Sequence, residues 1–70
     1  MTEDEARRIA THVHYKGGLY RYIGTATHSE TLEPLVVYEQ LWPKARSLWV
    51  RPAAMFNETL PDGQPRFRPL

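Results

Sequence analysis

The apolar run LVVYEQLW, residues 35–42, decides the fold of this chain. Alternate side chains of an extended segment point to opposite faces, so Leu35 and Val37 share one face. Val36 and Tyr38 share the other face. A strand that is apolar on both faces is usually central in its sheet or covered on its second face. We therefore expect residues 35–42 to form a buried strand that other strands flank.

Four shorter segments with strand character surround this run. Residues 19–28 are rich in aromatic and β-branched side chains, which are typical of strands. Four alternate residues of this segment are expected to share one face, namely Tyr20, Tyr22, Gly24 and Ala26. The small residues Gly24 and Ala26 indicate a bend or the close approach of another backbone. The expected strands are residues 12–15, 19–28, 35–42, 47–51 and 66–68.

Two short segments have helical character. In TEDEARRIA, Thr2 is suited to the N-cap, and Glu5, three residues later, completes a capping box. A helix of two turns is marginal alone, so Ile9 is expected to pack on the rest of the chain. The segment AAMF, residues 53–56, is long enough for one helical or 3₁₀ turn.

Five short strands joined by tight turns are typical of an all-β barrel or sandwich. Seventy residues are too few for a sandwich of about seven strands. The expected fold is mainly β: a small five-stranded barrel with a short N-terminal helix and a 3₁₀ or helical turn before the last strand. We expect a short helical segment over residues 1–11 and a single barrel domain over residues 12–70.

Composition excludes several classes of function. A chain of 70 residues buries only about 60% of its unfolded surface, which disfavours a deep active-site cavity. The absence of cysteine excludes disulfide scaffolds, thiolate catalysis and cysteine-ligated zinc. No apolar run is long enough to span a membrane, and the N-terminus has no apolar core of a secretion signal. We therefore expect a cytoplasmic protein without a cofactor and without a membrane partner.

The tetrapeptide His28-Ser29-Glu30-Thr31 contains the residue types of a nucleophile, a base and an orienting acid. Adjacent residues of a turn point in different directions, which disfavours proton sharing between His28 and Ser29. Short polar side chains also cap the amides of turns, and Pro34 favours an extended Glu33 before the next strand. The preferred interpretation of this tetrapeptide is therefore a structural turn. A polar rim of a binding site is the second interpretation, and a catalytic site is the third.

The three histidines, His12, His14 and His28, are the candidate metal ligands. His12 and His14 share a strand face, but imidazole sites usually need three or four ligands. No carboxylate stands at a comparable spacing, so partly exposed strand histidines are the preferred interpretation, and no metal is expected.

Aromatic residues alternate with basic ones toward the C-terminus. Trp49 and Arg51 share a strand face, and an aromatic platform beside arginine is how small domains bind peptides or single-stranded nucleic acid. Arg51 is expected to pair with an acid such as Glu30, or to act as a clamp for an anion or carboxylate. Residues 43–70 carry five basic and two acidic side chains. The basic tail Arg66-Phe67-Arg68 is a further candidate contact for nucleic acid.

The chain resembles a family of small bacterial proteins classed as a domain of unknown function. The resemblance covers residues 12–69 and implies an SH3-like β-barrel, while it implies no function. One departure from the family pattern is the loop Trp42-Pro43-Lys44-Ala45-Arg46, which is stiffer and more basic. The matching motifs are His14-Tyr15-Lys16-Gly17, Tyr20 to Gly24, His28 to Thr31 with Glu33, Val36 to Tyr38, Trp49 to Pro52, Met55-Phe56 and the terminal RFRP.

Three functional hypotheses follow from these patterns. The first is a non-enzymatic module that binds a protein, a peptide or a small polar ligand in a groove. The residues expected to line that groove are His28, Ser29, Glu30, Tyr38, Trp49 and Arg51. The second is a small barrel that binds single-stranded nucleic acid. The third, ranked last, is an enzyme that uses His28, Glu30 and Arg51. A homodimer formed through an exposed sheet edge is a further expectation.

Overall fold

The computed structural model describes residues 1–70 and contains two short helices and five strands. The helices are α1 (Glu3–Ile9) and α2 (Ala53–Phe56). The strands are β1 (His12–His14), β2 (Leu19–Thr27), β3 (Pro34–Trp42), β4 (Ser47–Pro52) and β5 (Phe67–Pro69). The mainly β class, the five strands and both helical segments are therefore confirmed.

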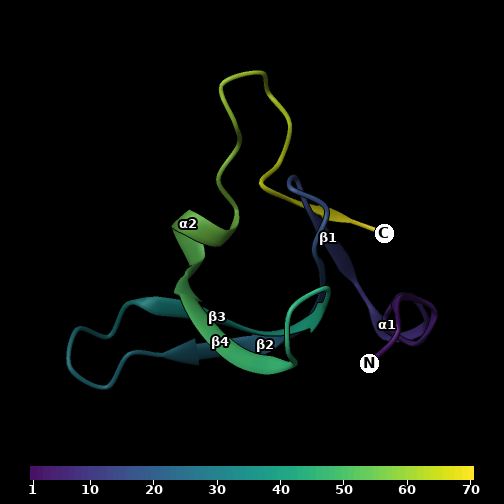
Figure 1. The fold of residues 1–70 in the computed structure, drawn as a ribbon. Helices are drawn as coiled ribbons and strands as arrows, with labels where there is room; N and C mark the ends of the chain where they lie inside the picture. The colour runs from purple at the N-terminus through teal and green to yellow at the C-terminus, as the bar shows by residue number, and fades with distance from the viewer.

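The five strands form one antiparallel sheet in the order β4-β3-β2-β1-β5. The sheet is curved but open, because β4 and β5 are its two edges and do not pair with each other (Figure 1). The closed barrel that the sequence predicts is therefore not found. The strand β5 has only three residues, and its backbone hydrogen bonds are made with β1. Helix α2 and the long loop after it connect the two edges in place of strand pairing.

The two faces of the sheet have separate apolar clusters. The inner face is defined as the face that carries Val36 and Tyr38, and Phe56 of α2 and Phe67 of β5 pack against these two residues. The inner cluster consists of Val36, Tyr38, Phe56 and Phe67, with Tyr20 and Ala53 packed against it. The outer face is covered at one end by α1. The outer cluster consists of Ala6, Leu19 and Leu41, with Ala10, Val13 and Trp42 packed against it. The prediction that residues 35–42 present apolar groups to both faces is confirmed.

A register shift in β2 changes which residues face inward. Tyr22 pairs with Tyr38, whereas Gly24 pairs with Val37, so one extra residue, Ile23, is inserted between the two pairs. Such a bulge bends the strand and disrupts the alternation of faces. The prediction that Gly24 shares a face with Tyr22 is therefore wrong, while the predicted bend is confirmed. The side of Gly24 on which a side chain would lie is open, because a Cβ atom placed there would meet nothing within 4 Å.

Helix α1 begins with the predicted capping box. The Glu5 amide donates to Thr2 Oγ1 at 3.2 Å, and the Thr2 amide donates to Glu5 Oε1 at 2.8 Å. The hydrogen bond from the Thr2 amide, with a further contribution from the Thr2 side chain, lowers the pKa of the Glu5 carboxyl. The contact that docks the helix is made by Ala6, which is fully buried, whereas Ile9 remains 37% exposed. Ile9, which was expected to pack on the rest of the chain, is only partly covered, and the small side chain of Ala6 lies on the face turned to the sheet.

The outer cluster predicts that two leucines of the same sheet contribute very differently to the free energy of unfolding. Leu41 is fully buried beneath α1, whereas Leu48 on β4 is 65% exposed. Replacing Leu41 by Ala removes buried methyl groups and leaves a cavity, so the free energy of unfolding should fall by about 2–5 kcal/mol. The matched substitution Leu48→Ala should change it by less than about 0.5 kcal/mol. Urea denaturation followed by circular dichroism measures both values, and equal effects would contradict the assigned core.

Candidate functional site

Two adjacent depressions lie on the inner side of the sheet, and both are lined by Tyr20 and Gln40. We call the pair the inner groove. The first depression, of about 230 Å³, lies between the β1–β2 turn and the β3–β4 loop, and its principal lining residues are His14, Lys16, Tyr20, Gln40, Trp42 and Lys44. The second, of about 220 Å³, is lined by Tyr20, Tyr38, Gln40, Trp49 and Arg51. The groove therefore combines aromatic rings, one amide and three cationic side chains.

Strand alternation and pairing bring these residues together. Tyr20 pairs with Gln40 across β2 and β3, and Tyr38 pairs with Trp49 across β3 and β4. Paired residues in an antiparallel sheet point to the same face, and residues two apart along one strand share that face as well. Arg51, two residues after Trp49, therefore joins the same side of the sheet.

Turn conformations place the two lysines at one end of the groove. Gly17 has a φ of 99°, in the left-handed region that glycine adopts without steric cost, and it closes the turn that carries Lys16. In the opposite loop, the Gln40 side-chain amide donates to the Ala45 carbonyl at 2.8 Å. This hydrogen bond holds the loop that carries Lys44 against β3.

The cations of the groove have no acidic partner. Lys16, Lys44 and Arg51 form no ion pair, whereas four other arginines do. The Arg51 Nε atom is screened from solvent and has no hydrogen-bond acceptor. None of the eight acidic residues of the chain lines either depression. The local charge of the groove is therefore positive, although the net charge of the chain is only +1.

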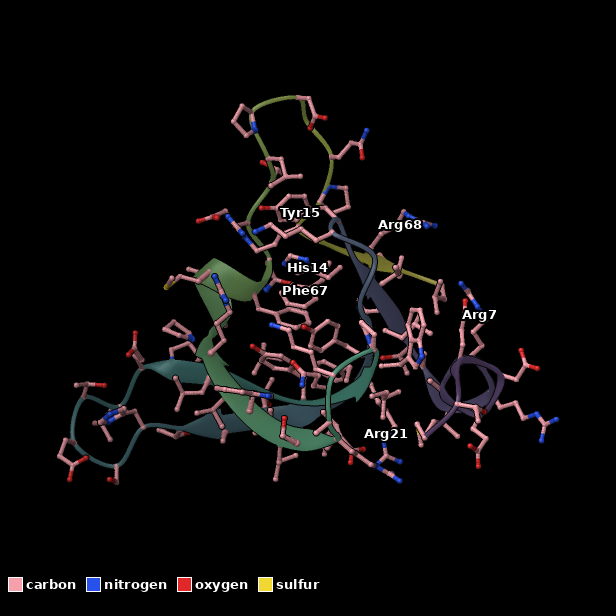
Figure 2. All side chains as sticks on the ribbon, viewed as in Figure 1. Arg7, His14, Tyr15, Arg21, Phe67 and Arg68 are labelled. Carbon is pink, nitrogen blue, oxygen red and sulfur yellow. The ribbon has the colours of Figure 1, made fainter.

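The best-paired carboxylate lies on the outer face instead. Glu39 accepts hydrogen bonds from Arg46 and lies 2.9 Å from Arg21. The hydrogen bonds from Arg46, together with the charges of Arg46 and Arg21, lower the pKa of Glu39. Figure 2 shows Arg21 projecting from the side of the sheet opposite to His14 and Phe67. The alternation of β3 thus separates an acidic centre on one face from the cations on the other.

His14 lies at the boundary between the groove and the inner cluster. Its ring makes an edge contact with Phe67 at a centroid distance of 4.9 Å and lies 4.5 Å from the Tyr15 ring (Figure 2). The Lys16 amide donates to His14 Nδ1 at 3.2 Å. Burial lowers the pKa of His14, and the nearby charges of Arg66, Lys16 and Arg51 lower it further. An anion bound in the groove would oppose that effect.

Tyr20 is the residue shared by the inner cluster and both depressions. Its ring lies 5.3 Å from that of Phe67 and 5.8 Å from that of Tyr38. Burial raises the pKa of its hydroxyl, with a smaller contribution from Tyr38. The hydroxyl therefore remains protonated at neutral pH and acts as a neutral hydrogen-bonding group.

The 28–31 turn lies at the tip of the β2–β3 hairpin, outside the inner groove. His28 Nδ1 accepts hydrogen bonds from the amides of Glu30 and Thr31, at 3.1 and 3.2 Å. The Thr31 hydroxyl accepts one from the Glu33 amide at 3.3 Å. These bonds confirm the predicted turn with its own side chains as caps. The imidazole of His28 also contributes to this capping, a role that was predicted only for the short polar side chains.

The expected pair between Arg51 and Glu30 is not formed. Glu30 instead accepts a hydrogen bond from the Ser29 hydroxyl at 2.8 Å and lies 3.5 Å from His28 Nδ1. Arg51 lies opposite Val36 in the body of the sheet, whereas Glu30 belongs to the hairpin tip. The six predicted groove residues thus fall into two separate groups. The inner groove contains Tyr38, Trp49 and Arg51, and the hairpin tip contains His28, Ser29 and Glu30.

Six principal residues of the groove were not among the predicted groove residues: His14, Lys16, Tyr20, Gln40, Trp42 and Lys44. The shared face of Tyr38 and Gln40 was visible in the alternation of the strand. The two lysines lie in different turns, and nothing in their spacing shows that these turns meet.

His12 lies apart from the groove, with its ring 5.6 Å from that of Phe56. No three His, Cys, Asp or Glu side chains gather as a metal site would need, and no helix is long and apolar enough to cross a membrane.

The surroundings of His14 predict how stability depends on pH. Because the folded state disfavours its protonated form, the unfolded chain takes up a proton first as the pH falls below about 6.5. The free energy of unfolding should therefore decrease between pH 7 and pH 5.5, and His14→Gln should reduce this dependence. Proton–nitrogen NMR titration of the folded protein should show His14 titrating below its ordinary range. A His14 pKa at or above about 6.5 would contradict the assigned environment.

Comparison with known proteins confirms the resemblance to a family of unknown function. The family model described as a protein of unknown function (DUF1653) matches residues 10–69. No curated protein and no solved structure matches the chain. The match covers most of the 70 residues, and the chain is therefore a member of this family of unknown function.

Proposed function

We propose that this domain is a non-enzymatic binding module that holds an extended, negatively charged ligand in the inner groove. The observation that carries the proposal is the set of three cations without acidic partners, Lys16, Lys44 and Arg51, beside aromatic rings of which Trp49 is exposed. Cations without acidic partners in the chain are free to bind external anions, and charge-assisted hydrogen bonds are among the stronger ones.

The dimensions of the groove favour a chain-like ligand over a compact one. Pockets for drug-sized molecules usually measure about 300–1,000 Å³, and each depression is smaller than that. Two small depressions that share Tyr20 and Gln40 suit a linear ligand that places one group in each. Segments of proteins and of nucleic acids both have this form.

The groove chemistry supports binding better than catalysis. Its polar groups are cations, an amide, a protonated phenol and an imidazole whose Nδ1 already accepts the Lys16 amide. The serine and histidine that the enzyme hypothesis uses lie at the hairpin tip, where His28 serves as an amide cap. Nucleophilic catalysis needs a base aimed at its nucleophile, and the hairpin tip supports no such pair.

The proposal extends to the architecture. We regard the sheet as an opened relative of the SH3-like barrel. Five antiparallel strands and a helical turn before the last strand support this relationship, and the open edge between β4 and β5 distinguishes the domain from a closed barrel.

The proposed function predicts that groove cations and other surface cations contribute differently to binding. The probes are two anionic polymers of similar charge, an oligothymidylate and an oligoglutamate, titrated in low salt by isothermal calorimetry. Arg51→Ala should weaken binding of the preferred polymer by about tenfold, and Lys16→Ala with Lys44→Ala should do likewise.

The control for these variants is Arg8→Ala. Arg8 is an exposed arginine of α1 without an ion pair, so its loss removes the same charge at a distance from the groove and should change affinity by less than about twofold. Failure of both polymers to bind, or an equal loss in Arg8→Ala, would overturn the proposed function.

A further inference from the structure

Trp49 presents an unusually open aromatic surface on the edge strand β4. Its side chain is 51% exposed, although tryptophan usually buries most of its large area. The indole Nε1 donates to the Ser47 hydroxyl at 2.7 Å. This bond holds the ring in one orientation over the second depression. A fixed, half-exposed ring loses little conformational freedom when a flat group stacks on it.

Cations flank the aromatic rings at both ends of the inner groove. Arg51 lies beside Trp49 in the second depression, and Lys16 and Lys44 lie beside Trp42 in the first. Single-stranded nucleic acid is bound by this combination, in which bases stack on aromatic rings and cations contact the phosphates between them. The alternation of ring and cation along the groove matches the alternation of base and phosphate along a strand.

Gln40 adds a polar group between the two depressions. Its amide nitrogen donates to the Ala45 carbonyl at 2.8 Å, and its side-chain oxygen accepts no hydrogen bond within the chain. An amide oxygen held in this way can accept a hydrogen bond from the Watson–Crick edge of an unpaired base.

We infer that the ligand of the inner groove is single-stranded nucleic acid, with a base stacked on Trp49 and adjacent phosphates held by Arg51, Lys16 and Lys44. This inference rests on the proposed function and names its ligand class. A duplex is excluded from this mode, because its bases are already stacked on one another and cannot reach Trp49. An acidic peptide would use the cations but would leave the open face of Trp49 without a flat partner.

The test compares ligands that separate charge from stacking. Both tryptophans of the chain line the groove, so quenching of intrinsic fluorescence reports binding directly. The probes are oligothymidylate and oligouridylate of about ten nucleotides, an abasic phosphodiester of equal length, a duplex, and an oligoglutamate of equal charge. Both single strands should bind at least about fivefold more tightly than the abasic chain, the duplex or the peptide. The ratio of the affinities for oligouridylate and oligothymidylate shows whether the groove prefers RNA or DNA.

Two substitutions of Trp49 test the stacking contact. Trp49→Ala should weaken oligothymidylate binding by about 5- to 150-fold while leaving the affinity for the abasic chain unchanged. Trp49→Phe, which retains a ring, should recover most of the loss. Leu48→Ala is the control, because this exposed neighbour points to the outer face and should bind like the parent protein. Affinities of the Trp49 variants are measured by anisotropy of labelled oligonucleotides, and circular dichroism confirms that each variant is folded.

The salt dependence tests the phosphate contacts. For single strands, log K falls with log salt by about 0.7 for each phosphate contact, so Arg51→Ala should reduce the slope by about that amount. Equal affinity for abasic and base-bearing chains, or preference for the duplex, would overturn the inference. Binding of oligoglutamate alone, abolished by the loss of Arg51, would also overturn it while leaving the proposed function in place. Failure of every polyanion to bind would overturn both.

Discussion

The stacked rings of Phe56 and Phe67 hold the two edges of the sheet near each other. Their centroids are 4.4 Å apart and their planes differ by 7°. Phe56 ends the helical turn after β4, and Phe67 begins β5, so this contact joins the edges that no hydrogen bond connects. Tyr38 packs against both rings at 5.3 and 5.5 Å. An apolar contact thus does in this domain what strand pairing does in a closed barrel.

The core and the candidate site share residues because the domain is small. Tyr20 and Tyr38 belong to the inner cluster and also line the groove. A chain of 70 residues has few large side chains to divide between a core and a site. Changes in the cluster should therefore propagate to the shape of the groove, whereas Trp49 and Arg51 on the edge strand can vary with less effect on packing.

Local sequence patterns predicted the helices and strands. The openness of the sheet and the residues that meet in the groove depend on contacts between distant parts of the chain. The capping box spans only Thr2 to Glu5, and the two apolar faces of residues 35–42 follow from alternation alone. The bulge at Ile23 was not predictable, because this residue suits a regular strand as well as its neighbours do. The openness of the sheet depends on how β4 and β5 meet, which no local pattern encodes. The missing pair of Arg51 and Glu30 has the same cause, because a hairpin tip and an edge strand are placed by the whole sheet.

The register shift between Tyr22 and Gly24 divides β2 into two halves with opposite orientations. Before the shift, Tyr20 and Tyr22 face inward; beyond it, Thr25 pairs with the inward-facing Val36. A relative that lacked Ile23 would keep the same pairs on both sides of this position, because Tyr22 and Gly24 would then be adjacent, as Tyr38 and Val37 are. The loss would remove the local bend that a bulge introduces and would leave the facing side chains unchanged. A change of one residue in length at this position is thus a means by which evolution can alter the direction of the hairpin tip while the pairs that form the groove are kept.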